Sequence, residues 1–87
     1  MVTFTSVLFH VNGTESRWGY KGKKPSLAEL QSAVGGYVEA INLPAGFVML
    51  VDEDGLQKQL PLNQRASQEA GRMIVGNALV LDRRLMS

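Results

Sequence analysis

The stretch VGGYVEAINLPAGFVMLVDEDG, residues 34–55, decides the fold of this 87-residue chain. Its glycine pair predicts the end of a helix, because glycine readily adopts the left-handed conformation in which helices commonly terminate. Two β-rich runs follow, at residues 37–43 and 47–52, and the Pro-Ala-Gly corner between them predicts a chain reversal. The second run is almost continuously apolar, which is typical of a strand covered on both faces.

Upstream of this stretch, residues 26–36 predict one short helix. Ser26 and Glu29 have the spacing of a capping box, in which each side chain accepts a hydrogen bond from the other residue's backbone. Leu27, Leu30 and Val34 fall on one stripe, which predicts that the helix packs on a sheet through a narrow apolar face. Gly35 or Gly36 is the expected stop.

The N-terminal part, residues 3–21, predicts a β-hairpin. Asn12-Gly13 is the preferred pair for a two-residue turn, and this turn would place Val11 opposite Thr14. In that register one face of the hairpin collects five large apolar side chains, which we expect to face the core: Val7, Phe9, Val11, Trp18 and Tyr20.

After residue 55 the pattern predicts a short strand at residues 56–60 and a turn of helix at residues 65–70, capped by Asn63. The last strand is expected at residues 73–82, interrupted by a bulge at Gly76-Asn77. Together these elements predict a single α+β domain over residues 1–87: a mixed or antiparallel sheet of five to six strands with one covering helix. The element order resembles the β-grasp plan, and a plain antiparallel sheet is the alternative.

Composition narrows the function classes. Nine Lys and Arg against eight Asp and Glu give a formal net charge of +1, far from the balance of a general nucleic-acid binder. The chain has no cysteine and one histidine, so we expect no metal, no cofactor and no catalytic residues. The N-terminus alternates hydroxyl and apolar residues instead of showing a basic leader, and no apolar run approaches a membrane span; we therefore expect a cytoplasmic protein with no membrane partner.

Several short motifs in order resemble a family of small bacteriophage and bacterial proteins known as domain of unknown function 3846. They are SLAELQSAVGGYVEAINL, FVMLVDEDG, LPLNQRA and IVGNALVL, and they span about residues 26–81. The resemblance implies a phage or mobile-element source and the cytoplasm of a host cell, without an assigned reaction. The first hairpin lies outside the well-matched region, and its Trp18 and basic loop are expected to be particular to this chain.

The polar residues within these motifs are the candidate binding residues: Glu39, Glu53, Asn63, Arg65 and Asn77. A cluster of Glu, Asn and Arg side chains could hold a phosphate or a small polar ligand. The structural interpretation is favoured, since Asn63 can cap a helix, Arg65 can pair with Glu39 or Glu53, and Asn77 can sit in a bulge. Asp52–Gly55 lacks the spaced ligands of a calcium loop, and His10 opposite Glu15 suggests a cross-strand pair instead of a catalytic group.

A second group combines aromatic and basic residues: Arg17, Trp18, Tyr20, Lys21, Lys23 and Lys24. The aromatic rings could stack on bases and the cations could neutralise phosphates. Burial of Trp18 and Tyr20 in the core is the favoured interpretation. Two functions therefore stand. The leading hypothesis is a non-enzymatic, interaction or regulatory protein that binds a host or phage protein through a sheet edge or helix surface. The alternative is nucleic-acid or nucleotide binding through this basic patch or the Arg65 region.

Overall fold

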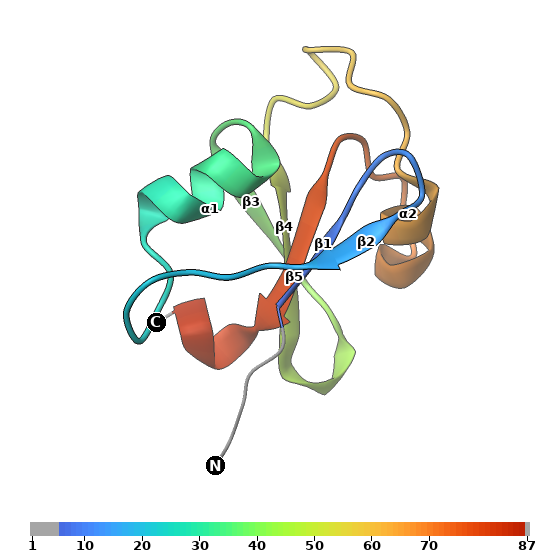
Figure 1. The fold of residues 1–87 in the computed structure, drawn as a ribbon. Coiled ribbons are helices and arrows are strands. Elements are labelled where there is room, and N and C mark those ends of the chain that lie inside the picture. The colour runs from blue at the N-terminus through green and yellow to red at the C-terminus, as the bar shows by residue number, and fades with distance from the viewer. Residues whose placement is uncertain (1–5, 87) are drawn as a thin grey trace.

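Five strands form one sheet in a computed structural model that describes residues 6–86. Every neighbouring pair of strands is antiparallel, and the last strand lies in the centre (Figure 1). The predicted α+β class and antiparallel sheet are therefore confirmed, while residues 3–5 of the predicted hairpin lie outside the described residues. The order across the sheet is β2 (Glu15–Arg17), β1 (Val7–Phe9), β5 (Ala78–Asp82), β4 (Phe47–Asp52) and β3 (Val38–Asn42).

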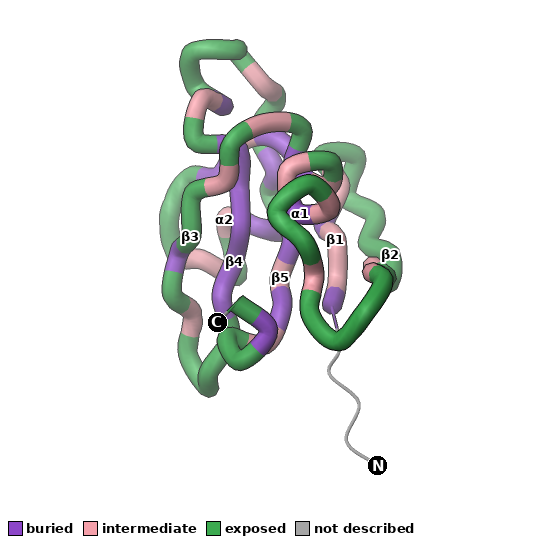
Figure 2. Tube along the Cα trace, turned by 90° about the vertical axis from the view of Figure 1, so that its left-hand side faces the viewer, coloured by how far each residue is buried: buried purple, intermediate pink, exposed green. Residues whose placement is uncertain are grey.

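A helix covers each face of this sheet, so the prediction of one covering helix is wrong. Helix α1 (Leu27–Val34) packs on one face, and α2 (Gln64–Ala70) packs on the other (Figure 1). Strand β4 is buried along five of its six residues (Figure 2) because its alternate side chains enter two different cores. The β-grasp plan is not confirmed, since the sheet is antiparallel throughout and has helices on both faces.

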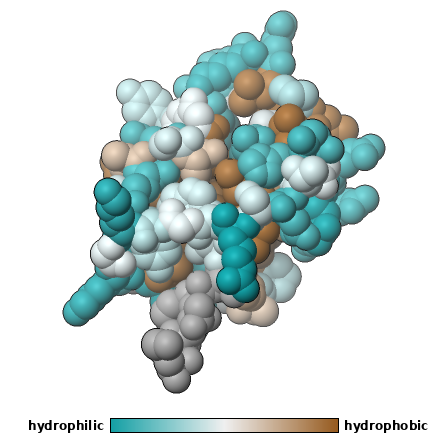
Figure 3. Space-filling view, viewed as in Figure 1, coloured by the Kyte–Doolittle hydropathy of each residue, from teal (hydrophilic) through white to brown (hydrophobic). Residues whose placement is uncertain are grey.

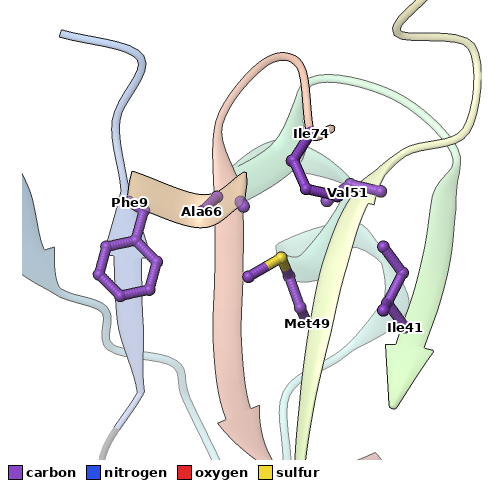
Figure 4. Packing of buried hydrophobic residues seen from close by; sticks show 7 residues of the cluster. Phe9, Ile41, Met49, Val51, Ala66 and Ile74 are labelled. Carbon is purple, nitrogen blue, oxygen red and sulfur yellow. The ribbon is translucent and has the colours of Figure 1, made fainter. Parts of the chain in front are cut away.

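The core under α2 is built from alternate residues of the strands. Met49 and Val51 of β4 lie beside Ile41 of β3, and Ala66 of α2 packs over them (Figure 4). Seven buried residues make up this cluster: Phe9, Ile41, Met49, Val51, Ala66, Ile74 and Ala78. A helix of only seven residues depends on such packing, because short helices are marginal in water.

The core under α1 uses the other set of strand residues. Leu30 and Val34 are the buried residues of the predicted helix stripe, whereas Leu27 is exposed. They pack against Val48 and Leu50 of β4, and the C-terminal 3₁₀ helix η2 (Arg83–Met86) closes the cluster. The remaining buried members are Leu79, Leu81 and Leu85.

The predicted helix ends are confirmed in detail. Ser26 and Glu29 form the full capping box of α1, and Gly35 ends that helix in the left-handed conformation with φ 87°. Asn63 caps α2 by accepting a hydrogen bond from Ala66 N–H, and Gly71 ends it with φ 69°. These local signals were readable from the sequence because each satisfies backbone groups within a few residues.

The register of the first hairpin differs from the prediction by one residue. Phe9 pairs with Glu15, and Leu8 pairs with Ser16. The loop has three residues instead of two: Gly13 N–H bonds His10 O, His10 N–H bonds Thr14 O, and Gly13 has φ 91°. This is a turn followed by a left-handed glycine, and the extra residue moves Trp18 and Tyr20 to the α1 face, opposite Phe9.

Two predicted strands are shorter or missing. Residues 56–60 form consecutive turns, with hydrogen bonds from Lys58 N–H to Asp54 O and from Leu60 N–H to Gly55 O. The predicted strand 73–82 is reduced to β5 and an isolated bridge between Leu62 and Val75. Local hydrogen bonds around the acidic turn thus replace the predicted strand at residues 56–60.

Ala45 provides a test of the corner between β3 and β4. It lies within the 3₁₀ turn η1 (Pro44–Gly46) at φ 64°, a conformation in which an L side chain is strained. We expect Ala45→Gly to raise the free energy of unfolding by about 0.5–1 kcal/mol, measured by urea denaturation. Ala40→Gly in β3 is the matched control and should lower it by a similar amount. A loss of stability in Ala45→Gly would contradict the geometry of this turn.

Candidate functional site

The structure brings together only two of the five candidate binding residues. Glu39 of β3 and Glu53, just after β4, line one small hollow of about 70 Å³. Asn63, Arg65 and Asn77 do not line it. The five motif residues are therefore not one ligand site.

Asn63 is a buried structural residue that joins three segments. Its side chain is fully buried, and its Nδ2 donates hydrogen bonds to Phe9 O at 3.0 Å and Gly76 O at 2.9 Å. Its Oδ1 accepts from Ala66 N–H at 3.0 Å, and its backbone N–H donates to Ile74 O. Asn63 thus ties the start of α2 to β1 and to the segment before β5, and its polar atoms are already used.

Asn77 also connects two segments of the chain, in a less buried position. Its Oδ1 accepts a hydrogen bond from Val11 N–H at 3.1 Å and so anchors the loop of the first hairpin. The preceding Gly76 has φ 78°, and an added Cβ there would lie 2.8 Å from Leu60 Cδ1. The irregular Gly76-Asn77 step is therefore required by close packing at the point where the chain enters β5.

The prediction that Arg65 pairs with Glu39 or Glu53 is wrong. Arg65 Nε lies 3.3 Å from Glu69 Oε1 one turn along α2, and Arg65 Nη1 lies 3.9 Å from Glu15 Oε1 of the hairpin. The guanidinium also stands 5.1 Å from the centre of the Phe9 ring. Helix α2 faces β1 at this residue, so Arg65 is remote from the hollow; Glu39 instead has Arg72 as its partner, at 4.0 Å.

The hollow lies at the β3 side of the α2 face. Its polar lining comes from Glu39, Asp52, Glu53 and Arg72, and its apolar lining includes Leu56 and Met73. Arg72, Leu56 and Met73 were not among the sequence candidates. Nothing in the local pattern marked them, because Leu56 was assigned to a strand and residues 72–73 follow the end of a short helix.

Asp52, the last residue of β4, has a buried carboxylate that forms an ion pair at this end of the sheet. Only 1% of its side chain is exposed, and its carboxylate accepts hydrogen bonds from Lys58 Nζ at 2.7 Å and from Asp54 N–H at 2.9 Å. Burial of Asp52 raises its pKa, but these two hydrogen bonds and the charge of Lys58 outweigh burial and hold the pKa below its ordinary value. Lys58 also donates to Gly35 O at 3.3 Å, so the pair joins the acidic turn to the end of α1.

Strand β3 leaves one edge of the sheet open. Glu53 N–H bonds Tyr37 O, and Leu43 N–H bonds Phe47 O, each at 2.9 Å. Hydrogen-bonded and non-hydrogen-bonded pairs alternate along an antiparallel ladder, so Glu39 and Ile41 also face β4. The backbone N–H and C=O groups of Val38, Ala40 and Asn42 therefore point outward, and they have no hydrogen-bond partner within residues 6–86.

The opposite edge strand is better protected against pairing. Strand β2 has three residues, all exposed, and two of them are charged; Figure 2 shows it as an exposed segment at the far side of the sheet from β3. Short, charged edges resist pairing with another chain. Strand β3 has five residues and neither proline nor lysine, so it is the more receptive of the two edges.

Three exposed apolar side chains lie at the end of the sheet where β3 begins, and two of them line the hollow. Leu56 (68% exposed), Tyr37 (65%) and Met73 (62%) are the most exposed large apolar residues of the described chain. Leu56 and Met73 line the hollow. Tyr37 lies next to Glu53 in the ladder and on the same face as Glu39. Apolar surface is also visible below the hydrophilic loop at the top of Figure 3. Clustered exposed apolar side chains mark interaction sites better than single ones.

The basic patch does not present its rings as a stacking platform. Trp18 and Tyr20 are half-buried, pack against the core under α1, and lie with ring centroids 5.7 Å apart. The four basic residues are exposed around them, and Lys21 N–H donates to Glu29 Oε2 at 2.9 Å. Trp18 also lines a groove between α1 and the hairpin, together with Glu29, Ser32 and Asn77.

His10 does not face Glu15 as predicted. Its Nε2 lies 2.9 Å from Ser16 Oγ, while Glu15 points toward Arg65 at 3.9 Å. Within residues 6–86 no carboxylate bonds the other ring nitrogen of His10, so the ring lacks the carboxylate partner of a Ser-His-Asp arrangement. The described residues also contain no group of three or more His, Cys, Asp or Glu side chains placed to hold a metal ion.

The architecture defines a small α+β domain with a five-stranded antiparallel sheet between two helices and one open edge. The sequence model of one family, domain of unknown function 3846, matches residues 7–84, and the chain belongs to this family. The match includes the first hairpin, so the expectation that the hairpin lies outside the matched region is wrong. No curated protein and no solved structure matches the chain. No helix within residues 6–86 is long and apolar enough to cross a membrane.

Proposed function

We propose that this domain binds a partner protein by adding an extended segment of that partner to strand β3. The observation that carries the proposal is the open edge, where the peptide groups of Val38, Ala40 and Asn42 point outward without partners in the described chain. In β-strand addition such groups supply the affinity through backbone hydrogen bonds, and neighbouring side chains supply the specificity.

The surroundings of β3 support this mode of binding. Tyr37, just before β3, is exposed and would lose contact with water beside an added strand, and Leu56 and Met73 add exposed apolar surface at the hollow that Glu39 of β3 lines. We further propose a non-enzymatic role in the cytoplasm of a phage or mobile-element host, as the resemblance to the family implies. The partner is then a host or phage protein.

The nucleic-acid alternative has less support from the geometry. A binder of single strands presents aromatic faces on which bases stack, whereas Trp18 and Tyr20 contribute to the core under α1. The formal net charge of +1 also provides little attraction for a phosphate backbone. We therefore propose no nucleic-acid function for the basic patch.

Proline at residue 40 tests the proposed edge. Ala40 points its N–H outward, so Ala40→Pro removes one edge donor and adds bulk there without removing a bond to β4. We expect a partner captured from host lysate by the wild-type protein to be lost from the Ala40→Pro bait. The comparison uses immobilised baits, nuclease-treated lysate and mass spectrometry, after circular dichroism has shown that both proteins are folded.

Glu15→Pro is the matched control at the other edge of the sheet. Glu15 forms a non-hydrogen-bonded pair with Phe9, so its N–H also points away from the neighbouring strand. This variant is expected to retain the partner. Capture that is unaffected by Ala40→Pro, or that disappears with nuclease treatment, would contradict binding of a protein at β3.

A further inference from the structure

The charges around the open edge favour a cationic occupant. The hollow beside β3 is lined by Glu39, Glu53 and Arg72 and by Asp52, whose buried carboxylate is directed toward the end of α1, although the whole chain has a formal net charge of +1. Lys58 neutralises Asp52, and Arg72 lies 4.0 Å from Glu39. Glu53 is exposed and has no ion-pair partner within residues 6–86. This end of the sheet therefore has an excess of negative charge.

The geometry of strand addition determines which side chains of a bound segment lie near these carboxylates. Side chains of an added strand alternate between the two faces of the sheet. Those on the α2 face lie beside Tyr37, Glu39 and Ile41, because these residues share that face of β3. A side chain opposite Glu39 lies at the rim of the hollow, because Glu39 is the β3 residue that lines it, and side chains two residues away on either side lie next to Tyr37 and Ile41.

We infer that the occupant of the β3 edge is an extended segment with a lysine or arginine at the position opposite Glu39 and apolar residues two positions before and after it. This inference rests on the proposed function and names the chemistry of its partner. The basic side chain lies next to Glu39 and extends across it toward Glu53 on the β4 side, and the flanking apolar side chains cover Tyr37 and Ile41. The other face of the segment is unconstrained by this pattern.

A second copy of the chain fits this edge less well. Two antiparallel β3 strands would be related by a two-fold axis perpendicular to the sheet, which keeps the α2 faces on the same side. The two hollows would then lie next to each other, with Glu39 and Glu53 of both copies on one surface. Like charges on neighbouring strands oppose pairing, whereas a basic segment is attracted to them.

A pair of synthetic peptides tests the inference. The probe is an N-acetylated, C-amidated heptapeptide, Thr-Val-Thr-Lys-Thr-Val-Thr, whose lysine and two valines share one face in an extended conformation. The matched peptide has Glu in place of Lys. Titration into the ¹⁵N-labelled full chain, followed by NMR, gives both dissociation constants, and amide exchange shows which backbone groups become protected.

We expect the Lys peptide to bind about fivefold more tightly than the Glu peptide, on the scale of one half-exposed charge pair. Amide protection is expected at Val38, Ala40 and Asn42. The preference should fall in Glu53→Gln and at high salt, because both weaken the attraction, and it should persist in Glu15→Gln at the far edge.

Other outcomes would contradict the cationic requirement, the binding edge or the proposed function. Equal binding of both peptides at β3 would overturn the cationic requirement while supporting the edge itself. Absence of binding by either peptide up to millimolar concentration would overturn the inference, and the Ala40→Pro capture experiment would still decide the proposed function separately. Peptide-induced protection or shifts confined to residues 17–24 would overturn both.

Discussion

Gly36→Val is expected to lower the free energy of unfolding by about 3 kcal/mol or more, because it separates an ion pair with one buried member. A Cβ atom at Gly36 would lie 2.7 Å from Lys58 Nζ and 2.8 and 2.9 Å from the two carboxylate oxygens of Asp52. The Lys58 side chain can move into solvent, but the Asp52 side chain is 99% buried and cannot follow it. Without Lys58 the Asp52 carboxylate keeps only the hydrogen bond from Asp54 N–H and is a buried charge without a counter-ion.

The neighbouring glycine supplies the control for this prediction. Gly35 has φ 87°, and a Cβ added there meets nothing within 4 Å. Gly35→Ala should therefore cost only the strain of the left-handed conformation, about 1 kcal/mol, whereas Gly36→Ala should cost more with the same added methyl group. Urea denaturation of the two alanine variants measures the difference. A larger loss in Gly35→Ala than in Gly36→Ala would contradict this prediction. It would mean that the left-handed helix stop contributes more to stability than the space that Gly36 leaves for the Asp52–Lys58 pair.

Asn63→Ala is expected to lower the free energy of unfolding by about 3 kcal/mol or more. The substitution removes the α2 cap, which is worth about 1 kcal/mol, and leaves Phe9 O and Gly76 O without the donor that they share. Buried polar groups left unsatisfied cost about 1–3 kcal/mol each. The expected consequence is loss of α2 and loosening of its contacts with β1.

Ser26→Ala serves as the comparison, because Ser26 caps α1 from an exposed position. Its cost should stay near 1 kcal/mol. Thermal and urea denaturation of both variants measure the two effects, and ¹⁵N NMR shows whether the Asn63→Ala spectrum changes at Phe9 and Gly76. Equal losses in the two variants would indicate that Asn63 acts only as a cap.

The accuracy of the sequence-based predictions depended on how local the determining interactions are. Strand β4, the capping box at Ser26 and the cap at Asn63 were predicted correctly, and the helix stop at Gly35 was one of the two that were expected. Each depends on backbone groups or apolar side chains within a few residues. The hairpin register was wrong because two loop lengths are compatible with Asn12-Gly13, and only packing against both cores selects between them.

The candidate site was harder to predict than the fold. Glu39 and Glu53 come together because β3 and β4 are neighbouring strands, which the Pro-Ala-Gly corner predicted. Arg72 and Met73 reach the same hollow only because α2 crosses the second face of the sheet and returns the chain there. The assignment of Arg65 to Glu39 or Glu53 was wrong for the same reason, since the path of α2 turns Arg65 toward Phe9.

By itself, the sequence determined the α+β class, the helix ends and the pairing of β3 with β4, because short-range hydrogen bonds and hydrophobic periodicity act within a few turns or one hairpin. Only the tertiary structure decided that α2 covers a second face and that residues 53–60 form turns around Asp52. It also decided that β3 is an edge. These features depend on contacts between segments distant in the chain, and the same edge gives the domain its proposed binding surface.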